Sequence, residues 1–502
     1  MMFVKHFLSK GPSALCRNVI STTVKSLSTH SKTTSPSSEN FEKLLGQPFH
    51  HSHPHLLKPN ELVPGLSKRE FIERRSRFAA RVHSSDPKVH HIVLVPSATV
   101  RYMSDKIPYV FRQNTDFLYL TGCQEPESAL VMHVEPDGSF NSFIFVREKN
   151  AHSELWEGPR TGVKNAAEVF AVDHSKCVST LQNALISMWK DLKKATFWYD
   201  FSSPAHDEIH RSVINFLSIC KSKEVSPIRP TLHQMRLIKS EEEQALMIEA
   251  GVIGSKAIET AIRLTKPGLT EHQLFATIDY QCRMNGADYL AYPPVIASGT
   301  NATIIHYINN NQMMHDGDLI LVDAGCELHG YCSDITRTWP VNGKFSDNQA
   351  TLYEIVLSVQ LDLLKLCNEF PSLDVLFKRM TELLGQRLSE AHVLSKKCDT
   401  LKLEEVAFKL CPHHVGHFLG MDVHDTSNVK RKFPSKEGMV ITVEPGVYIN
   451  ESNELVKPEF RGIGIRIEDD VLFTASGPRV LSTVPKTIKD LESLVGKDYV
   501  GN

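Results

Sequence analysis

The sequence has neither a long apolar run nor a closely spaced cysteine pair. No stretch of about 18 consecutive apolar residues occurs, so the sequence predicts no membrane-spanning helix. The 10 cysteines are scattered and none belongs to a C-x-x-C pair, which argues against a structural zinc site and is typical of buried thiols in a reducing compartment. The formal net charge is only −2, so the sequence shows no electrostatic footprint for nucleic acid.

Acidic residues are absent from the first 38 residues. This segment holds 14 serines and threonines and five basic residues, which are Lys5, Lys10, Arg17, Lys25 and Lys32. A basic, hydroxyl-rich start without a continuous apolar core is typical of a mitochondrial transit peptide and not of a secretory signal. We therefore expect residues 1–38 to direct the protein to the mitochondrion, in particular the matrix, with a cytosolic pool as a second location. A disordered cytosolic tail is the alternative.

The remaining length exceeds that of one typical domain, so two domains are expected. Residues 39–64 are rich in histidine and proline and predict an irregular connecting segment, with metal binding by the histidines as the weaker alternative. Residues 65–228 predict an α/β domain with a charged helix over 67–83, apolar strands over 91–96, 129–133 and 142–146, and a helix-rich stretch after them. Pro227 and Pro230 mark a linker.

Residues 240–490 predict a second domain that mixes helices and strands. Two sequences, Ser240 to Glu243 and Thr270 to Gln273, have the spacing of a capping box and predict helix starts. Long helices are expected over 347–368 and 373–392. Strands are expected over 289–299, 319–322, 331–339, 438–446 and 462–471.

Two aspartates stand out in a predicted hairpin. Strands over 319–322 and 331–339 are joined by a segment bracketed by Gly325 and Gly330. A turn at residues 328–329 would place Asp323 opposite Asp334, where two like charges repel at about 4.5–5.5 Å between Cβ atoms. Two divalent ions about 3.5–4 Å apart would relieve that repulsion. The alternative is a pair of solvated aspartates on an open face.

Three further polar residues lie in the second half. The spacing of His413 and His417 resembles the zinc-binding H-E-x-x-H helix, but His414 replaces the glutamate and Gly416 weakens a helix, so that interpretation fails. Strand 438–446 ends near Glu444, and alternation in 462–471 places Arg466 and Glu468 on one face. Alone, His417 could be a structural histidine, Glu444 a turn residue and Glu468 a partner of Arg466. Together with the aspartates, four carboxylates and one imidazole favour Mn²⁺ or a similar ion.

The chain resembles the pita-bread metallopeptidases, the group of methionine aminopeptidase, prolidase and aminopeptidase P. The resemblance rests on DAG at 323–325, SDITRT at 333–338, HHVGHFLGMDVHD at 413–425, VEPG at 443–446 and RIED at 466–469. In the first half, NTDFLYLTG at 114–122 and ELWEGPRTG at 154–162 are similar to the creatinase-type domain of aminopeptidase P. HSHPHLLKPNELVPG at 51–65 resembles the mitochondrial, intermediate-cleaving branch of that group.

The resemblance implies a creatinase-like α/β domain followed by an α+β pita-bread catalytic domain with two divalent ions per subunit, most simply Mn²⁺. It implies removal of the amino-terminal residue from peptides with proline in second position, and processing of imported mitochondrial proteins. The implied metal ligands are Asp323, Asp334, His417, Glu444 and Glu468. The resemblance also implies that His306 contacts the scissile amide, that His424 contacts the tetrahedral intermediate and that Glu444 carries a proton. His413 and Arg466 would shape the proline pocket, and Arg466 would also hold Glu468. Tyr292 would line the substrate pocket.

Several alternatives to this interpretation remain. Tyr292 could be a plain core tyrosine. A prolidase that cuts only dipeptides would carry the same motifs, whereas methionine aminopeptidase lacks an amino-terminal domain of this kind. A non-enzymatic pita-bread protein that binds partners would have lost metal ligands, and all five are present here. The expected partners are peptide substrates and a second copy in a homodimer, with no nucleic acid and no membrane span.

Overall fold

The computed structural model describes residues 45–220, 224–398 and 401–497. The predicted transit peptide, 1–38, and the beginning of the connecting segment lie outside the described residues. The rest of that segment forms successive turns over residues 50–60 and then two short paired strands, β1 (Glu61–Val63) and β2 (Leu66–Ser67). This irregular path agrees with its histidine- and proline-rich composition.

A six-stranded mixed sheet organises the first half of the chain. Its strand order is β10-β9-β3-β6-β7-β8, and β3 pairs antiparallel with β6 and parallel with β9. The strands are β3 (His90–Pro96), β6 (Ala129–Val134), β7 (Phe140–Val146), β8 (His174–Cys177), β9 (Ala195–Trp198) and β10 (Val225–Ser226). The sequence predicted a helix-rich stretch where β8 and β9 lie and named neither strand, because each has four residues and little apolar alternation.

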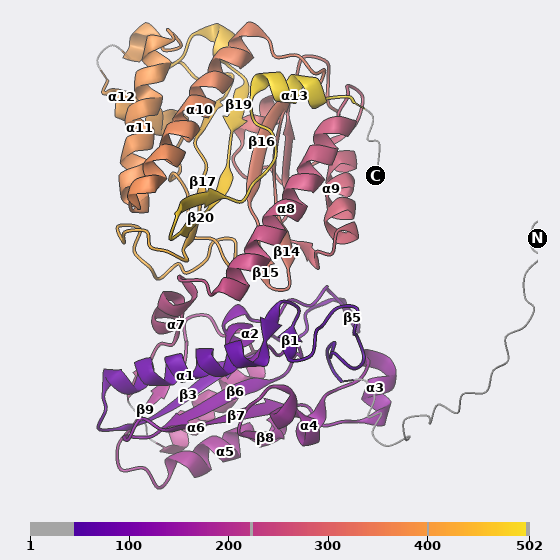
Figure 1. Ribbon diagram of the computed structural model, residues 1–502, viewed down its shortest axis with the longest axis vertical. Helices are drawn as coiled ribbons and strands as arrows, with labels where there is room; N and C mark the ends of the chain where they lie inside the picture. Colours follow the sequence, from indigo (N-terminus) through magenta and orange to yellow (C-terminus); the bar gives the residue numbers. More distant parts are fainter. Residues whose placement is uncertain (1–44, 221–223, 399–400, 498–502) are drawn as a thin grey trace, which may run out of the picture. The chain divides into compact units, whose positions relative to one another are not determined.

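Helices cover both faces of this sheet (Figure 1). On one face, Phe71, Phe78 and Val82 of α1 (Lys68–Ser85) share a core with Val93 and Val95. On the other face, α5 (Leu181–Trp189) and α6 (Asp207–Cys220) pack on Ile92 and Leu94. The remaining elements of this half are β4 (Tyr102–Ser104), β5 (Ile107–Pro108), α2 (Thr115–Thr121), α3 (Ala151–Glu157), α4 (Gly162–Val169) and α7 (Arg229–Arg236).

Both predicted capping boxes are confirmed in the second half. Ser240 and Glu243 exchange side-chain and backbone hydrogen bonds at the start of α8 (Glu241–Leu264), and Thr270 and Gln273 do so before α9 (Glu271–Met284). The two predicted long helices are α10 (Asp347–Leu366) and α11 (Leu373–Glu390), followed by α12 (Leu403–Leu410) and α13 (Ile488–Leu494).

The strands of this half form small antiparallel sheets. One sheet contains β12 (Val295–Ser298), β13 (Leu319–Ala324) and β16 (Ile335–Pro340). A second contains β17 (Val440–Val443), β20 (Asp469–Thr474) and β21 (Gly477–Val480). The others pair β11 (Tyr289–Leu290), β14 (Cys326–Leu328) and β15 (Tyr331–Cys332), and β18 (Gly446–Ile449) with β19 (Ile463–Arg466). The predicted combination of α/β and α+β architecture is therefore present.

The predicted hairpin exists, but its register is different. Asp323 lies opposite Thr336 and not opposite Asp334, because the turn is at His329 and Gly330, which both have positive φ angles of 52° and 88°. Such a two-residue turn matches the twist of the flanking strands. The strands are also interrupted at Gly325, where a Cβ atom would lie 1.7 Å from the Ser333 carbonyl oxygen. The facing-carboxylate geometry predicted from the sequence is therefore wrong.

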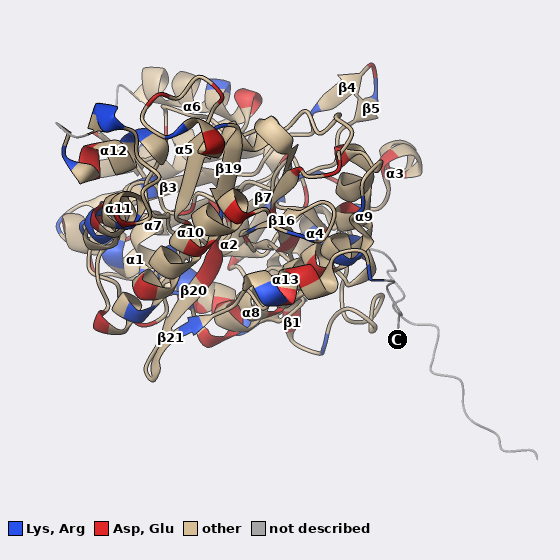
Figure 2. Cartoon of the chain, turned by 90° about the horizontal axis from the view of Figure 1, so that it is seen from above, with Lys and Arg blue, Asp and Glu red and all other residues tan. Residues whose placement is uncertain are grey.

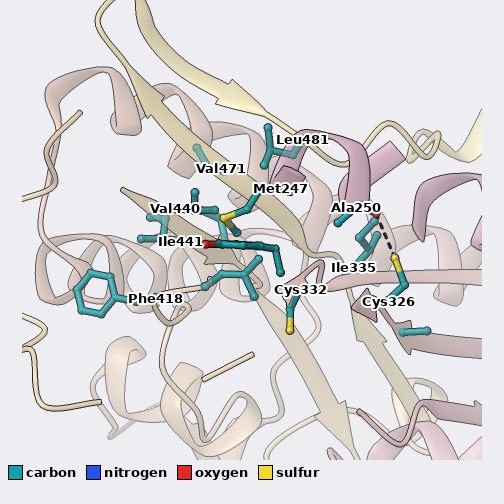
Figure 3. Close-up of a cluster of buried hydrophobic side chains, with 14 of the residues drawn as sticks. Met247, Ala250, Cys326, Cys332, Ile335, Phe418, Val440, Ile441, Val471 and Leu481 are labelled. Carbon is teal, nitrogen blue, oxygen red and sulfur yellow. Dashed lines mark hydrogen bonds between the residues drawn. The ribbon is translucent and has the colours of Figure 1, made fainter. Parts of the chain in front are cut away.

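Apolar packing fixes this hairpin against α8 and the neighbouring sheet (Figure 3). The Cys326 thiol donates a hydrogen bond to the carbonyl oxygen of Ala250 at 3.5 Å. Each fully buried aliphatic side chain contributes about 1.5–3 kcal/mol to the free energy of folding. The cluster also contains Met247, Cys332, Ile335, Phe418, Val440, Ile441, Val471 and Leu481. It supports the chain on both sides of Asp334.

Charged residues of both signs are interspersed along the helices in the view of Figure 2. Within residues 45–220, 224–398 and 401–497, none of the helices combines the length and the apolar character that a bilayer crossing requires.

Candidate metal centre

Five acidic and imidazole side chains from separate elements line one cavity of about 640 Å³. Asp323 lies near the end of β13, and Asp334 lies in the break between β15 and β16. His417 follows α12, whereas Glu444 and Glu468 each lie between two strands. His306, His413, His424 and Arg466 line the same cavity. The structure thus brings together all the residues that the resemblance implied except Tyr292, which lines a neighbouring cavity.

Short distances connect the carboxylates with His417. Its Nε2 atom lies 3.3 Å from Asp334 Oδ2 and 3.8 Å from Glu444 Oε1. Ligand atoms of Asp334, His417 and Glu468 all lie within 4.8 Å of one another. The other ring nitrogen of His417 is 3.2 Å from the Phe418 carbonyl oxygen. Donation from Nδ1 to that carbonyl leaves Nε2 directed at the carboxylates, the position from which a histidine binds a metal once Nε2 has lost its proton.

Tyr292 reaches the centre with its hydroxyl group only. The hydroxyl lies 2.5 Å from Asp323 Oδ1 and 2.5 Å from Asp334 Oδ1, so it bridges the two aspartates that the strand register keeps from facing each other. Because it has one proton, it can donate to only one of them at a time. Tyr292 is therefore neither a plain core residue nor a wall of the main cavity.

The electrostatics of the cavity favour a cation. Burial and the neighbouring carboxylates raise the pKa of Glu468 well above its ordinary value. Burial also raises the pKa of Glu444, to about 7, although His417 and Arg466 oppose it. Burial lowers the pKa of His417, but Asp334 and Glu444 outweigh it and raise the pKa to about 9. Four carboxylates and the His417 imidazole converge with the Arg466 guanidinium beside them, and this oxygen-rich donor set fits hard divalent ions.

Arg466 joins the metal centre to a second group of residues. Its guanidinium donates to Asp323 Oδ2 at 2.6 Å and to the Tyr448 hydroxyl at 2.7 Å. It does not contact Glu468 directly; the connection runs through Thr336, which accepts from Arg466 and donates to Glu468 at 2.6 Å. The implied role of Arg466 in holding Glu468 is thus indirect. Neither Tyr448 nor Thr336 had a signal in the sequence that distinguished it from an ordinary strand residue.

His413 is fixed in one tautomer by this group. Tyr448 uses its proton on His413 Nε2 at 2.9 Å, because its oxygen already accepts from Arg466. The Nδ1–H group of His413 then donates to the His414 carbonyl oxygen at 2.8 Å. Burial and the positive charge of Arg466 lower the pKa of His413 to about 4. His413 is therefore neutral near pH 7 and presents a fixed imidazole face to the cavity.

Two histidines complete the cavity. The His424 ring packs edge-on against the His417 ring with centroids 4.5 Å apart. Burial and the adjacent His417 lower the pKa of His424, which keeps its imidazole neutral near pH 7. His306 is exposed and follows the short 3₁₀ turn Gly299–Thr303.

A buried carboxylate that sequence reasoning missed organises the loop of His306. Glu271, the first residue of α9, is fully buried and accepts hydrogen bonds from five groups. These are the Ser298 amide and hydroxyl, the Asn301 side chain, the Tyr307 hydroxyl and the Gln312 amide, at 2.8–3.1 Å. Donors on both sides of His306 therefore meet on one carboxylate. From the sequence, Glu271 is only a favourable acidic residue in a first helical turn.

Residues of the first half hold the loop of His424. Arg236 of α7 donates to Asp116 Oδ1 and to Asp422 Oδ2, both at 2.7 Å, and also contacts Asp425. Arg112 donates to the Met421 carbonyl oxygen at 2.8 Å. His424 is thus bracketed by two aspartates whose positions depend on a buried arginine.

Comparison with known proteins gives two family matches. Residues 245–475 match the model of metallopeptidase family M24, and residues 71–198 match that of the aminopeptidase P N-terminal domain. Human Xaa-Pro aminopeptidase 3 is 41% identical over 462 residues, which cover 90% of each chain. The mitochondrial intermediate cleaving peptidase 55 of Arabidopsis thaliana is 39% identical over 453 residues, covering 90% of this chain and 87% of that protein.

Solved structures agree with these matches. Zinc-substituted Escherichia coli aminopeptidase P in complex with product has a TM-score of 0.79 and 34% identity, and the match covers 86% of this chain and 98% of that one. The fold, the five convergent side chains and the near full-length relatives all agree. The chain belongs to metallopeptidase family M24, and its first half is an aminopeptidase P amino-terminal domain.

Proposed function

We propose that this protein is an aminopeptidase that removes the first residue of peptides with proline in second position. The observation that carries the proposal is the convergence of Asp323, Asp334, His417, Glu444 and Glu468 in one cavity. Relatives named Xaa-Pro aminopeptidase, which match most of the chain, support the substrate class. We further propose that the chain divides into the domains 65–228 and 240–490 predicted from the sequence.

Family membership implies a dinuclear centre of divalent ions, and we propose that these five residues hold it and that Mn²⁺ is the native ion. Bound there, such ions would lower the pKa of a water molecule and polarise the scissile carbonyl. Carboxylates dominate the donor set and no cysteine lines the cavity, which supports Mn²⁺ over ions that prefer thiolates.

The remaining side chains would bind substrate and move protons. Glu444 would take a proton from the attacking water and pass it to the leaving amine. His424, neutral and next to His417, would donate to the oxygen that becomes negative in the tetrahedral intermediate. His306, on its exposed loop, would contact the scissile amide. His413, fixed by Tyr448, and Arg466 would form the pocket for the proline ring.

Peptide hydrolysis tests this proposal and separates it from the alternatives. We expect cleavage of Xaa-Pro-Xaa tripeptides, much slower cleavage of matched Xaa-Ala-Xaa tripeptides, loss of turnover in chelator and recovery with Mn²⁺. Cleavage of Xaa-Pro dipeptides alone would indicate a prolidase. Full activity in chelator, with no metal in the sample, would overturn the metallopeptidase assignment, and no hydrolysis at all would favour a binding protein.

The Glu271→Ala variant is expected to lose about 10²-fold in kcat, because small displacements of a catalytic group have costs of that size. The substitution removes the acceptor that holds both sides of the His306 loop, while the metal ligands lie elsewhere. Metal content should therefore remain at the wild-type level, and KM should change less than kcat. Glu271→Gln keeps one acceptor oxygen, so its kcat should lie between that of Glu271→Ala and that of the wild type.

A matched control for this variant is Glu259→Ala. Glu259 lies on α8 and, among the described residues, forms its ion pair with Arg263 one turn away. The Glu259→Ala substitution should leave kcat unchanged. Loss of metal in Glu271→Ala, or wild-type kcat in that variant, would contradict the positioning role.

We propose that the protein acts in the mitochondrion, in particular the matrix, where it trims amino termini of imported proteins; a cytosolic pool is a second location. The similarity to the mitochondrial intermediate cleaving peptidase 55 of Arabidopsis supports this location. The five positive charges of residues 1–38 would be attracted by a negative matrix at about 2.3 kcal/mol per charge per 100 mV.

A reporter fused to residues 1–38 is expected to enter mitochondria. Changing Lys5, Lys10 and Arg17 to glutamate in the full chain should retain it in the cytosol with unchanged kcat. A wild-type reporter that stays cytosolic would refute the targeting proposal and leave the peptidase proposal intact.

We also propose a homodimer. Exposed apolar side chains on and beside the β4–β5 hairpin support it, since contiguous apolar surface is typical of interaction sites. They are Tyr102, Met103, Ile107, Tyr109 and Val110. Light scattering should give twice the mass of one chain, and a monomer mass at micromolar concentration would contradict the proposal.

A further inference from the structure

Two histidines and a glutamate gather at one end of the two central strands of the six-stranded sheet, β3 and β6, far along the chain from the metal centre described above. His90 is the first residue of β3, His133 belongs to β6, and Glu135 follows β6. One ligand atom of each lies within 4.8 Å of the others. All three side chains are partly exposed, at 26%, 17% and 31%. An ion from solvent can therefore reach them.

Strand register explains why these side chains share a face. His91 pairs with Val134 and Ile92 with His133, which places His90 opposite Glu135. Opposed residues of an antiparallel pair point to the same side, and so do residues two apart in one strand. Ile92 on this face packs into the core beneath α5 and α6. The cluster thus lies at the solvent-accessible end of strands β3 and β6, beside a packed core.

The separations match those of a zinc site. His90 Nδ1 lies 3.2 Å from His133 Nε2 and 2.9 Å from Glu135 Oε2. Ligands about 2.0–2.2 Å from a tetrahedral Zn²⁺ are about 3.4 Å from one another. The chosen atoms of His133 and Glu135 lie within 4.8 Å of each other, so these partly exposed side chains could reach one ion by small side-chain rotations.

Hydrogen bonds can satisfy this arrangement only in part: His133 Nδ1 can donate to Glu135 Oε1 over a long 3.5 Å, and the shorter contacts compete for one position on His90. In its ring plane, His90 Nδ1 carries either one proton or one lone pair, yet it faces both the His133 nitrogen and the Glu135 carboxylate. If His90 Nδ1 donates its one proton to Glu135, it has no second proton for the His133 nitrogen. One cation between three lone pairs satisfies all of them at once.

We propose that His90, His133 and Glu135 bind a divalent ion of the zinc class, with a fourth position open to water. Two imidazoles and a carboxylate are donors that Zn²⁺ accepts readily. The ion fastens the start of β3 to the end of β6. It lies outside the peptidase centre, so it stabilises the amino-terminal domain locally and leaves kcat unchanged. The site does not depend on the proposed activity.

Zinc stoichiometry and local hydrogen exchange test the site in the full chain. The wild type, His133→Asn, Glu135→Gln and the control His174→Asn are dialysed against Zn²⁺, and bound zinc is counted by elemental analysis. His174 lies in the same sheet but stacks on Phe143, away from the cluster. We expect His133→Asn to retain one equivalent less zinc than the wild type and than His174→Asn. Glu135→Gln should bind that equivalent at least tenfold more weakly.

Hydrogen exchange separates this ion from any bound in the peptidase centre. Zinc should slow amide exchange over residues 88–92 and 131–136 in the wild type and the His174→Asn control, and not in the other two variants. If His133→Asn fails to fold, judged by circular dichroism, Glu135→Gln carries the test. Equal zinc in all folded chains, or zinc-independent exchange in these segments of the wild type, overturns the proposal.

Discussion

The Asp334→Asn variant is expected to lose its metal and at least about 10³-fold in kcat, since metal-ion catalysis supplies several kcal/mol of transition-state stabilisation. Asp334 is 5% exposed and has Tyr292 on one carboxylate oxygen and His417 on the other. The amide keeps the size of the side chain but removes its charge and replaces one acceptor oxygen with a donor. Elemental analysis and steady-state kinetics on a Xaa-Pro-Xaa peptide measure both effects.

His424→Ala is the matched comparison. His424 lies in the same cavity, but it contacts the centre through the edge-on packing of its ring against His417 and not as one of the clustered ligand side chains. We expect it to lose turnover while keeping the metal. Equal metal loss in the two variants would show that His424 is a ligand and that the roles proposed for these residues are wrong.

The second large effect concerns stability. Arg236→Ala is expected to lower the free energy of unfolding by about 3–5 kcal/mol, the cost of leaving buried charges without their partner. Arg236 is 2% exposed and serves Asp116, Asp422 and Asp425 together. Urea unfolding followed by circular dichroism measures the change. Arg229→Ala, which removes a partly exposed arginine 4.0 Å from Asp116, should cost less than about 1 kcal/mol.

The same variant should alter the response to acid. Burial raises the pKa of Asp422, but Arg236 and Arg112 outweigh it and hold that pKa at about 2, below the value of about 3.9 in an unfolded chain. A depressed pKa adds stability above pH 4, and this contribution is lost as the pH falls from about 4 to about 2. The free energy of unfolding of Arg236→Ala should therefore fall less steeply than that of the wild type over that pH interval. Parallel curves for the two proteins would contradict this assignment.

Much of the metal centre was predictable because its ligands occur in distinctive local sequences. The four carboxylates lie at the ends of short apolar strands and His417 lies in a short polar segment, and their types indicate one chemistry even before they are brought together. Helix starts were predictable for a similar reason, because a capping box such as Ser240 to Glu243 is complete within four residues. Local patterns of this kind need no knowledge of the fold.

Contacts between distant segments were not predictable. The hairpin register depends on the positive φ angles of His329 and Gly330 and on the close approach of Gly325 to Ser333, which no periodicity reveals. Glu271, Thr336 and Tyr448 acquire their roles only from partners at least 18 residues away. The tautomer of His413 follows from a chain of hydrogen bonds that begins at Arg466.

The arginines that connect the two halves have a thermodynamic consequence. Arg74 of α1 donates to the Tyr331 hydroxyl at 3.1 Å, and Arg112 to Glu327 at 2.7 Å, so the first half contacts the hairpin that carries Asp334. Any free energy by which substrate binding tightens these contacts must appear equally as a change in substrate affinity when the first half is perturbed, because linkage is reciprocal. If substrate binding tightens these contacts, the amino-terminal domain takes part energetically in substrate recognition even where none of its atoms touches the substrate.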